Sequence, residues 1–199
     1  MVIRGYQGTS RRKKINKYWC DPLPDELLSR FRLVAAKITL GQFPLENLMA
    51  LSEQTLNQGV YHSALVSIMD LRPQTQAAVV SYLECICNDH DIPIGDTDWA
   101  LRYLLVHFIA RMSQSDSDAH SELVDLMHAV GPETLDRLYQ NRHLLGLDRI
   151  LFLGLQYNYH QQFGDDSSEG KEILKEVLVG LNDQLRIAAY EWKSKENQP

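Results

Sequence analysis

The segment from Trp99 to about Met112 constrains the fold more than any other part of the sequence. Apolar side chains occur around its whole expected helical circumference, and only Arg102, His107 and Arg111 interrupt them. A helix that is apolar on every side has to be enclosed by other helices. The segment therefore predicts an all-α protein in which it occupies the centre.

The remaining sequence supplies the helices for such an enclosure. Apolar residues recur at helical spacing between Gly and Pro residues, and no alternating pattern of useful length indicates a β-strand. Pro73 is expected to open one helix, and Gly164–Gly170 is expected to be a polar loop before the last helix. We expect about eight or nine helices in a compact bundle, with a short stack of helical repeats as the second possibility.

Charge divides the chain into two parts. Residues 1–20 contain six basic and no acidic side chains, which leaves 14 basic and 26 acidic side chains in the other 179 residues. The first part lacks apolar periodicity, and we expect it to be a flexible basic arm. Residues 21–199 are expected to form a single helical domain with a net charge of −12. We expect the arm to be a solvated leader that can fold back onto this acidic domain. The alternative is a contact for nucleic acid or anionic lipid, which the negative charge of the domain makes less favoured.

The chain is expected to be cytoplasmic. No stretch of 18 apolar residues is present, so we expect no membrane-spanning segment. The three cysteines are Cys20, Cys85 and Cys87, and this odd number does not indicate a disulfide framework. Cys85 and Cys87 point to different sides of a helix, which does not suit a shared zinc ion with His90, and packed cysteines are the favoured interpretation.

Cofactor motifs are not found in the sequence. It contains no His-Glu-x-x-His, Gly-x-Ser-x-Gly or Gly-x-Gly-x-x-Gly pattern, and we expect no cofactor. The acidic loop has one weak match to a calcium loop, with an unusual Glu at position 5 and Glu172 where an apolar residue is typical. An acidic helix start is the favoured interpretation. The calcium-loop residues would be Asp165, Ser167, Glu169, Gly170 and Glu176.

His107 and Arg111 form the most notable polar pair. They lie one helical turn apart on the most apolar helix, and Glu84 or Asp98 is a candidate partner. The simpler interpretation is a hydrogen-bonding cluster that sets the register of the helices. The functional interpretation is a ligand pocket or an acid/base site.

The segment Tyr157–Phe163 is rich in aromatic and amide groups and carries no Asp, Glu, Lys or Arg. Tyr157, Tyr159 and His160 are candidates for a partner surface, because such side chains are frequent in protein interfaces. Arg142 and His143 form a nearby basic region that could accompany them. The simpler interpretation is that Tyr157 and Phe163 pack in the core, while the rest of the segment and the nearby basic side chains are solvated.

One motif suggests a known group of proteins. Gly59, Ser63 and Leu65 form a Gly-x-x-x-Ser-x-Leu segment between two expected helix pairs, and Asp91-Ile92-Pro93 follows in a loop. From about Leu45 to Val130, this arrangement resembles a group of small bacterial all-helical proteins to which no activity is assigned. The resemblance implies a helical bacterial protein of the cytosol, and it brings no functional residues.

The sequence leaves three functional hypotheses. The favoured one is a non-enzymatic protein–protein interaction module with a basic partner, for example an immunity-type inhibitor that covers the active site of a basic toxin. The second is an enzyme or small-ligand binder that uses His107 and Arg111. The third is contact with nucleic acid through the basic arm. The chain is expected to be a monomer or a homodimer.

Overall fold

The computed structural model describes residues 22–70, 75–164 and 167–196, and this part of the chain folds into nine α-helices without a β-strand. The prediction of an all-α protein with eight or nine helices is therefore confirmed. The basic arm at residues 1–20 lies outside the described residues. The helices are α1 (Asp25–Thr39), α2 (Leu45–Asn57), α3 (Ser63–Met69), α4 (Gln76–Asp89), α5 (Thr97–Met112), α6 (Ala119–Val130), α7 (Pro132–Gln140), α8 (Asp148–Phe163) and α9 (Ser168–Glu196).

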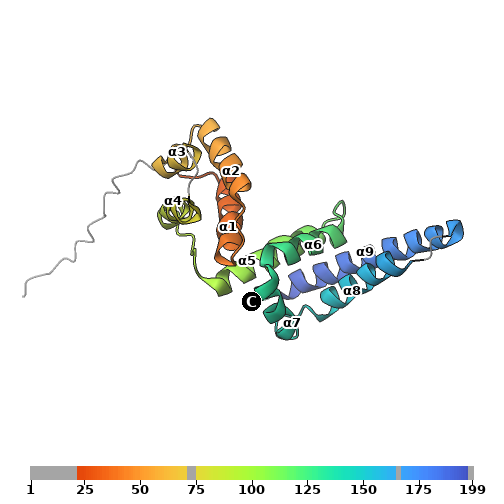
Figure 1. Cartoon of the computed structure of the whole chain (residues 1–199). Helices are drawn as coiled ribbons and strands as arrows, with labels where there is room; N and C mark the ends of the chain where they lie inside the picture. The colour runs from red at the N-terminus through yellow and green to blue at the C-terminus, as the bar shows by residue number, and fades with distance from the viewer. Residues whose placement is uncertain (1–21, 71–74, 165–166, 197–199) are drawn as a thin grey trace, which may run out of the picture.

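Two hydrophobic cores hold these helices together. The first core contains buried side chains of α1 to α4, among them Phe31 and Leu83. The second contains the end of α1 and buried side chains of α5 to α9, among them Leu104 and Leu185. The partly buried Trp99 at the start of α5 packs against both cores. Figure 1 shows the two groups of helices meeting where α1 crosses α5.

Helix α5 occupies the centre of the second core. It packs against α1, α6 and α9, so that neighbours cover most of its circumference. This placement agrees with its apolar sequence, because only enclosure removes all of these side chains from water. Its buried side chains are Ala100, Leu104, Leu105, Phe108, Ile109 and Met112.

Two helix starts differ from the sequence-based expectation. Helix α4 begins at Gln76 and not at Pro73, because the Thr75 hydroxyl accepts a hydrogen bond from the Ala78 amide and caps the helix. Helix α9 begins at Ser168, within the expected loop. There the Ser167 hydroxyl accepts a hydrogen bond of 3.0 Å from the Gly170 amide.

Polar side chains connect the helices of the first core with each other and with α5. His62 is buried; its Nδ1 accepts a hydrogen bond from the Ala64 amide, and its Nε2 lies 3.0 Å from a carboxylate oxygen of Asp89. These two bonds start α3 and tie it to α4. The Tyr103 hydroxyl of α5 donates to the Ser29 carbonyl of α1 over 3.0 Å. Each bond satisfies a polar group that packing has removed from water.

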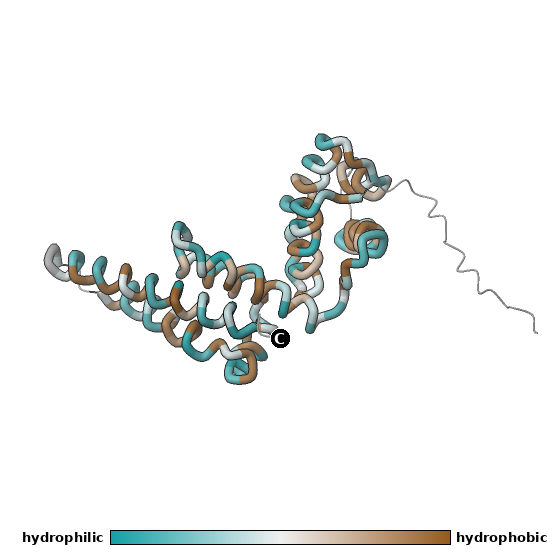
Figure 2. Tube along the Cα trace, turned by 180° about the vertical axis from the view of Figure 1, so that it is seen from behind, coloured by the Kyte–Doolittle hydropathy of each residue, from teal (hydrophilic) through white to brown (hydrophobic). Residues whose placement is uncertain are grey.

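Helices α8 and α9 form an antiparallel hairpin whose outer part extends beyond the rest of the protein. Figures 1 and 2 show the end of α8 and the start of α9 running side by side past the start of α6. Arg149 at the base of the hairpin pairs with Glu191 over 2.7 Å. None of the helices in the described part of the chain combines the length and the apolarity needed to cross a membrane.

The central position of α5 predicts that truncating a buried side chain of this helix destabilises the protein more than truncating an exposed one. Leu104→Ala, which removes a fully buried side chain, should lower the free energy of unfolding by about 2–5 kcal/mol. Val106→Ala, on the same helix but with 42% of its surface exposed, should change it by less than about 1 kcal/mol. Urea denaturation followed by circular dichroism checks both variants. Similar losses for the two would contradict the central position of α5.

Candidate functional site

Four large apolar side chains form a continuous exposed stripe along α8. We call this stripe the α8 ridge. Its members follow each other at intervals of three or four residues, which places them on one face of the helix. More than half of the surface of each one is exposed, and the residues are Phe152 (57%), Leu155 (55%), Tyr159 (62%) and Phe163 (70%).

The ridge lies in an uncharged stretch of α8 that follows Asp148 and Arg149 in the first turn of the helix. From Ile150 to Gly164 the chain contains no Asp, Glu, Lys or Arg. Tyr159 contacts Phe163 with a ring-centroid distance of 5.1 Å and His160 with one of 5.7 Å, so the aromatic rings lie together at the outer end of α8. Tyr159 is thus an exposed aromatic residue, and Phe163 is exposed as well and does not pack in the core. The ridge also contains Phe152 and Leu155, which the sequence did not single out.

The outer part of the α8–α9 hairpin contains little core. Between Leu155 and Gly180, none of the side chains that the structure describes is buried, although several are partly covered. Burial on α9 begins at Leu181 and continues through Leu185, where the helix reaches α5. Each of the two outer segments therefore has the other as its main apolar cover.

Tyr157 belongs to the inner face of α8 and not to the ridge. Its ring stacks on the ring of His120 from α6, with centroids 3.7 Å apart, and burial raises the pKa of its hydroxyl. The next residue, Asn158, accepts a hydrogen bond from His120 Nε2 over 2.9 Å. Gly154 lies one turn earlier, where a side chain would collide with Leu123 of α6. These contacts orient α8 so that the ridge faces outward.

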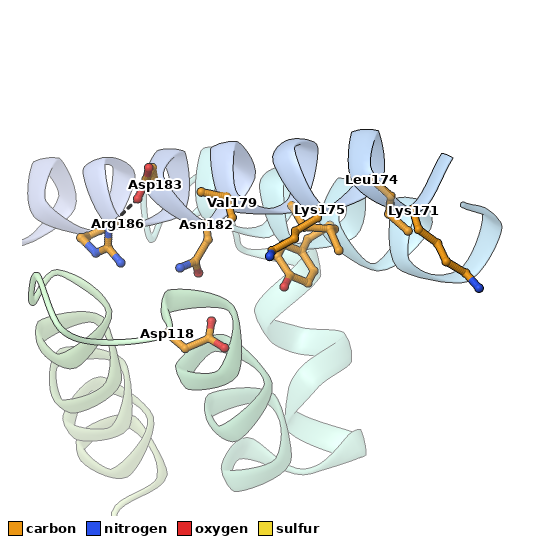
Figure 3. A pocket seen from close by; sticks show the side chains of 10 residues that line it. Asp118, Lys171, Leu174, Lys175, Val179, Asn182, Asp183 and Arg186 are labelled. Atoms are coloured by element: carbon orange, nitrogen blue, oxygen red, sulfur yellow. Dashed lines mark hydrogen bonds and ion pairs between the residues drawn. The ribbon is translucent and has the colours of Figure 1, made fainter. Parts of the chain in front are cut away.

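A cavity of about 490 Å³ lies beside Tyr157 and is lined mostly by α9 (Figure 3). Lys171 and Lys175 stand at one end, and Arg186 stands at the other. Arg186 pairs with Asp183 and donates to the carbonyls of Gln114 and Ser117 over 3.0 and 2.9 Å. Its guanidinium group thus holds the loop between α5 and α6, and this structural role accounts for its placement.

Arg142 and His143 lie at the opposite end of α8 from Tyr159. Both side chains contact the same carboxylate oxygen of Asp148, at 3.2 Å from Arg142 Nε and 2.6 Å from His143 Nδ1. They fasten the loop before α8 to the first turn of that helix. The structure therefore does not bring this basic region together with the aromatic end of the ridge.

His107, Arg111 and Glu84, which the sequence suggested as one polar cluster, have different partners in the structure. The His107 ring packs 6.3 Å from the Tyr103 ring and 5.1 Å from the Phe108 ring, and its Nε2 is buried without a hydrogen-bond partner. Arg111 pairs instead with Glu122 of α6 over 2.7 Å. Glu84 is exposed on α4, where it faces Cys87 and helps to raise the pKa of that thiol.

The cavity next to Arg111 has a volume of about 380 Å³ and is lined from α1, α5, α6 and the loop after α1. Lys37, Asp125 and His128 contribute to its lining, whereas His107 and Glu84 do not. The second oxygen of Glu122 is buried without a partner. His107 and Arg111 therefore do not line this cavity together, as a catalytic pair would.

A third cavity, of about 600 Å³, lies between α6, α7 and α8. Its size is typical of small-molecule sites, and its lining combines apolar side chains with uncharged polar ones. The polar members are Gln42, His128, Asn158 and Gln162. Sequence reasoning missed this arrangement because the four residues come from three distant segments that only the fold brings together.

The structure places the two helical cysteines and some of the candidate calcium ligands. Cys87 is buried in the first core, and burial raises the pKa of its thiol to about 12, while Cys85 is exposed. Of the candidate calcium residues, Asp165 lies outside the described residues, and Ser167 acts as the cap of α9. Within the described residues, no group of three or more His, Cys, Asp or Glu side chains is placed to hold a metal ion.

The sequence matches no protein-family model, and no match was found among the curated proteins or the solved structures with which it was compared. The class of this protein therefore rests on its own architecture. It is an all-helical protein with two cores and an extended α8–α9 hairpin that exposes an uncharged apolar ridge.

The environment of His107 predicts a loss of stability at acidic pH. Burial lowers the pKa of His107 from its ordinary 6.5, and the nearby charges of Arg111 and Lys37 lower it further. As the pH falls below 6.5, the unfolded state takes up a proton before the folded state does, so the free energy of unfolding decreases until the pKa of the folded state is reached. Burial of His90 acts in the same direction.

Urea denaturation at about pH 7.5 and about pH 5.5 measures this change in unfolding free energy, because the two values span the pH range in which histidine titrates. His107→Gln, which retains a polar planar side chain, should reduce the difference in unfolding free energy between the two pH values. An equal difference in the variant and in the original protein would show that His107 is not the group responsible.

Proposed function

We propose that this chain is a non-enzymatic protein–protein interaction module and that the α8 ridge is its main binding surface. The observation that carries the proposal is the ridge itself, with three aromatic side chains and one leucine exposed in a stretch of 15 residues without Asp, Glu, Lys or Arg. Interface centres are depleted in charge and enriched in aromatic residues, and their aromatic side chains often carry most of the binding energy.

The spacing of the ridge supports this role. Side chains at intervals of three and four residues along an exposed helix are the pattern by which helices dock into apolar grooves or against other helices. Single exposed apolar residues are ordinary on protein surfaces, but a contiguous row of four is not. The row from Phe152 to Phe163 extends over about 16 Å, at roughly 1.5 Å per residue.

The acidic charge of residues 21–98 favours a second binding surface, for a basic partner. Residues 21–98 contain four basic and eleven acidic side chains, and residues 73–101 contain five acidic side chains without a Lys or Arg. Glu84, Asp91 and Asp98 of this stretch are exposed. Complementary charge increases the rate at which proteins associate, as required of an immunity-type inhibitor that has to reach a basic toxin quickly.

The enzyme hypothesis receives less support. His107 does not line the cavity beside Arg111, and its low pKa keeps it neutral among packed aromatic rings. A general acid or base needs hydrogen-bond access to a bound substrate. His62 has both ring nitrogens engaged, one by the Ala64 amide and the other by Asp89.

Affinity capture with the full chain tests the role of the ridge. Tyr159→Glu places a charge in the centre of the uncharged surface, and we expect it to abolish the capture of partner proteins from the native lysate. Tyr61→Glu is the matched control, because Tyr61 is similarly exposed (54%) but lies before α3. Quantitative mass spectrometry compares the two variants with the original chain. Equal loss of capture in both variants, or in neither, would contradict the proposal.

Binding of a lysine-rich peptide tests the acidic surface. The affinity should decrease as the salt concentration is raised from about 50 to about 300 mM, because the charges lie at the surface and are screened. The double variant Asp91→Asn/Asp98→Asn should bind more weakly at low salt. Glu172→Gln/Glu176→Gln on α9 removes the same charge elsewhere and should have a smaller effect. Equal effects of the two double variants would indicate that only the net charge matters.

A further inference from the structure

We propose that the occupant of the α8 ridge is the ridge of a second copy of this chain. Two α8 helices would pack antiparallel, ridge against ridge, about a two-fold axis, with each α9 on the outer side of its own α8. This inference rests on the proposed interaction role and names its partner. It is carried by the incomplete burial of the hairpin, by the spacing of the ridge and by the distribution of charge.

The outer hairpin has apolar residues on more faces than two helices can cover. Leu174, Val177 and Leu178 on α9 are partly covered, while more than half of the surface of each ridge side chain is exposed. Two packed helices leave their outer faces in water, and the ridge lies on such a face of α8. The α8 helix of a second copy, packed ridge against ridge, supplies the missing cover.

The ridge is complementary to itself. When two copies of α8 run antiparallel with their centres near residue 157, Phe152 of one chain lies opposite Phe163 of the partner subunit. In the same register, Leu155 lies opposite Tyr159 of the partner subunit. A two-fold interface requires this relation, because each contact has to occur twice. An apolar row with its large residues at only one end would not satisfy it.

The distribution of charge favours the α8 ridge as the surface for self-association. Each copy carries a net charge of −6, so two copies repel each other over most of their surfaces. The stretch Ile150–Gly164 contributes no such repulsion, because it contains no Asp, Glu, Lys or Arg. A second copy therefore meets the smallest electrostatic penalty where it also finds the largest apolar row.

The area of the ridge is close to what a stable dimer needs. An aromatic side chain buries about 150–250 Å² when it is enclosed, and the three on the ridge expose 57%, 62% and 70% of their surfaces. With Leu155, two copies would bury roughly 800–900 Å² from these four positions alone. Flanking side chains such as Gln156 and His160 would bring the total to the roughly 1,000 Å² that marks a specific interface.

Sedimentation equilibrium of the full chain over a dilution series tests the proposal. We expect a species with twice the chain mass of 22.8 kDa that dissociates on dilution. Added NaCl should strengthen the dimer, because salt screens the repulsion between two acidic chains and leaves an uncharged interface intact. Tyr159→Glu and Leu155→Gln should each weaken dimerisation by about tenfold or more, while Tyr61→Glu should leave it unchanged.

Three results would overturn the inference. The first is an unmodified chain that remains monomeric up to about 100 µM, far above the dissociation constant of a specific dimer. The second is a dimer that the ridge variants do not weaken while circular dichroism shows them to be folded. The third is a dimer that salt dissociates, which would indicate contact between the basic arm and the acidic surface. A monomeric chain that still captures a protein through Tyr159 would exclude the second copy and retain the proposed interaction role.

Discussion

The enclosure of α5 is the constraint on which the rest of the structure depends. Leu104 and Ile109 point to different sides of this helix and are both fully buried, so neighbours are required on more than one side. Helix α1 covers one side, and α6 and α9 cover others. Helices α2 and α4 then pack on α1, α3 packs on α2 and α4, and α8 packs on α9. The positions of the outer helices thus follow from the need to remove one central helix from water.

The exposed ridge is a consequence of helix lengths. Helix α5 has 16 residues and α9 has 29, which correspond to about 24 and 44 Å. The part of α9 from Leu181 onward lies against α5 and is buried there. Its first half extends beyond α5 and has mainly α8 to pack against. Helix α8 uses its inner face to contact α9 and α6, the latter through Tyr157 and Gly154, and its opposite face is exposed.

Much of the fold could be predicted from the sequence, because periodicity and capping act locally. The Asp96 carboxylate accepts a hydrogen bond from the Trp99 amide at the start of α5, which is the local capping for which Asp is favoured before a helix. The partner of Arg111 could not be predicted in the same way, because Glu122 reaches it only after α6 has folded back onto α5. The segment Tyr157–Phe163 was recognisable as unusual, but only the packing of α8 shows that Tyr157 faces inward and Tyr159 outward.

The first half of α8 resembles α5 in its pattern, with apolar residues on all sides from Ile150 to Leu155. This pattern predicts enclosure, and for α5 the rest of the chain provides it. For α8 the chain provides only half of it, since Leu151 and Leu153 are buried while Phe152 and Leu155 are exposed. Local pattern and global structure usually agree, and a disagreement between them tends to mark a functional surface. Our proposal that α8 is half of an interface rests on this disagreement, because the helix has the composition of a buried helix and is exposed on one face.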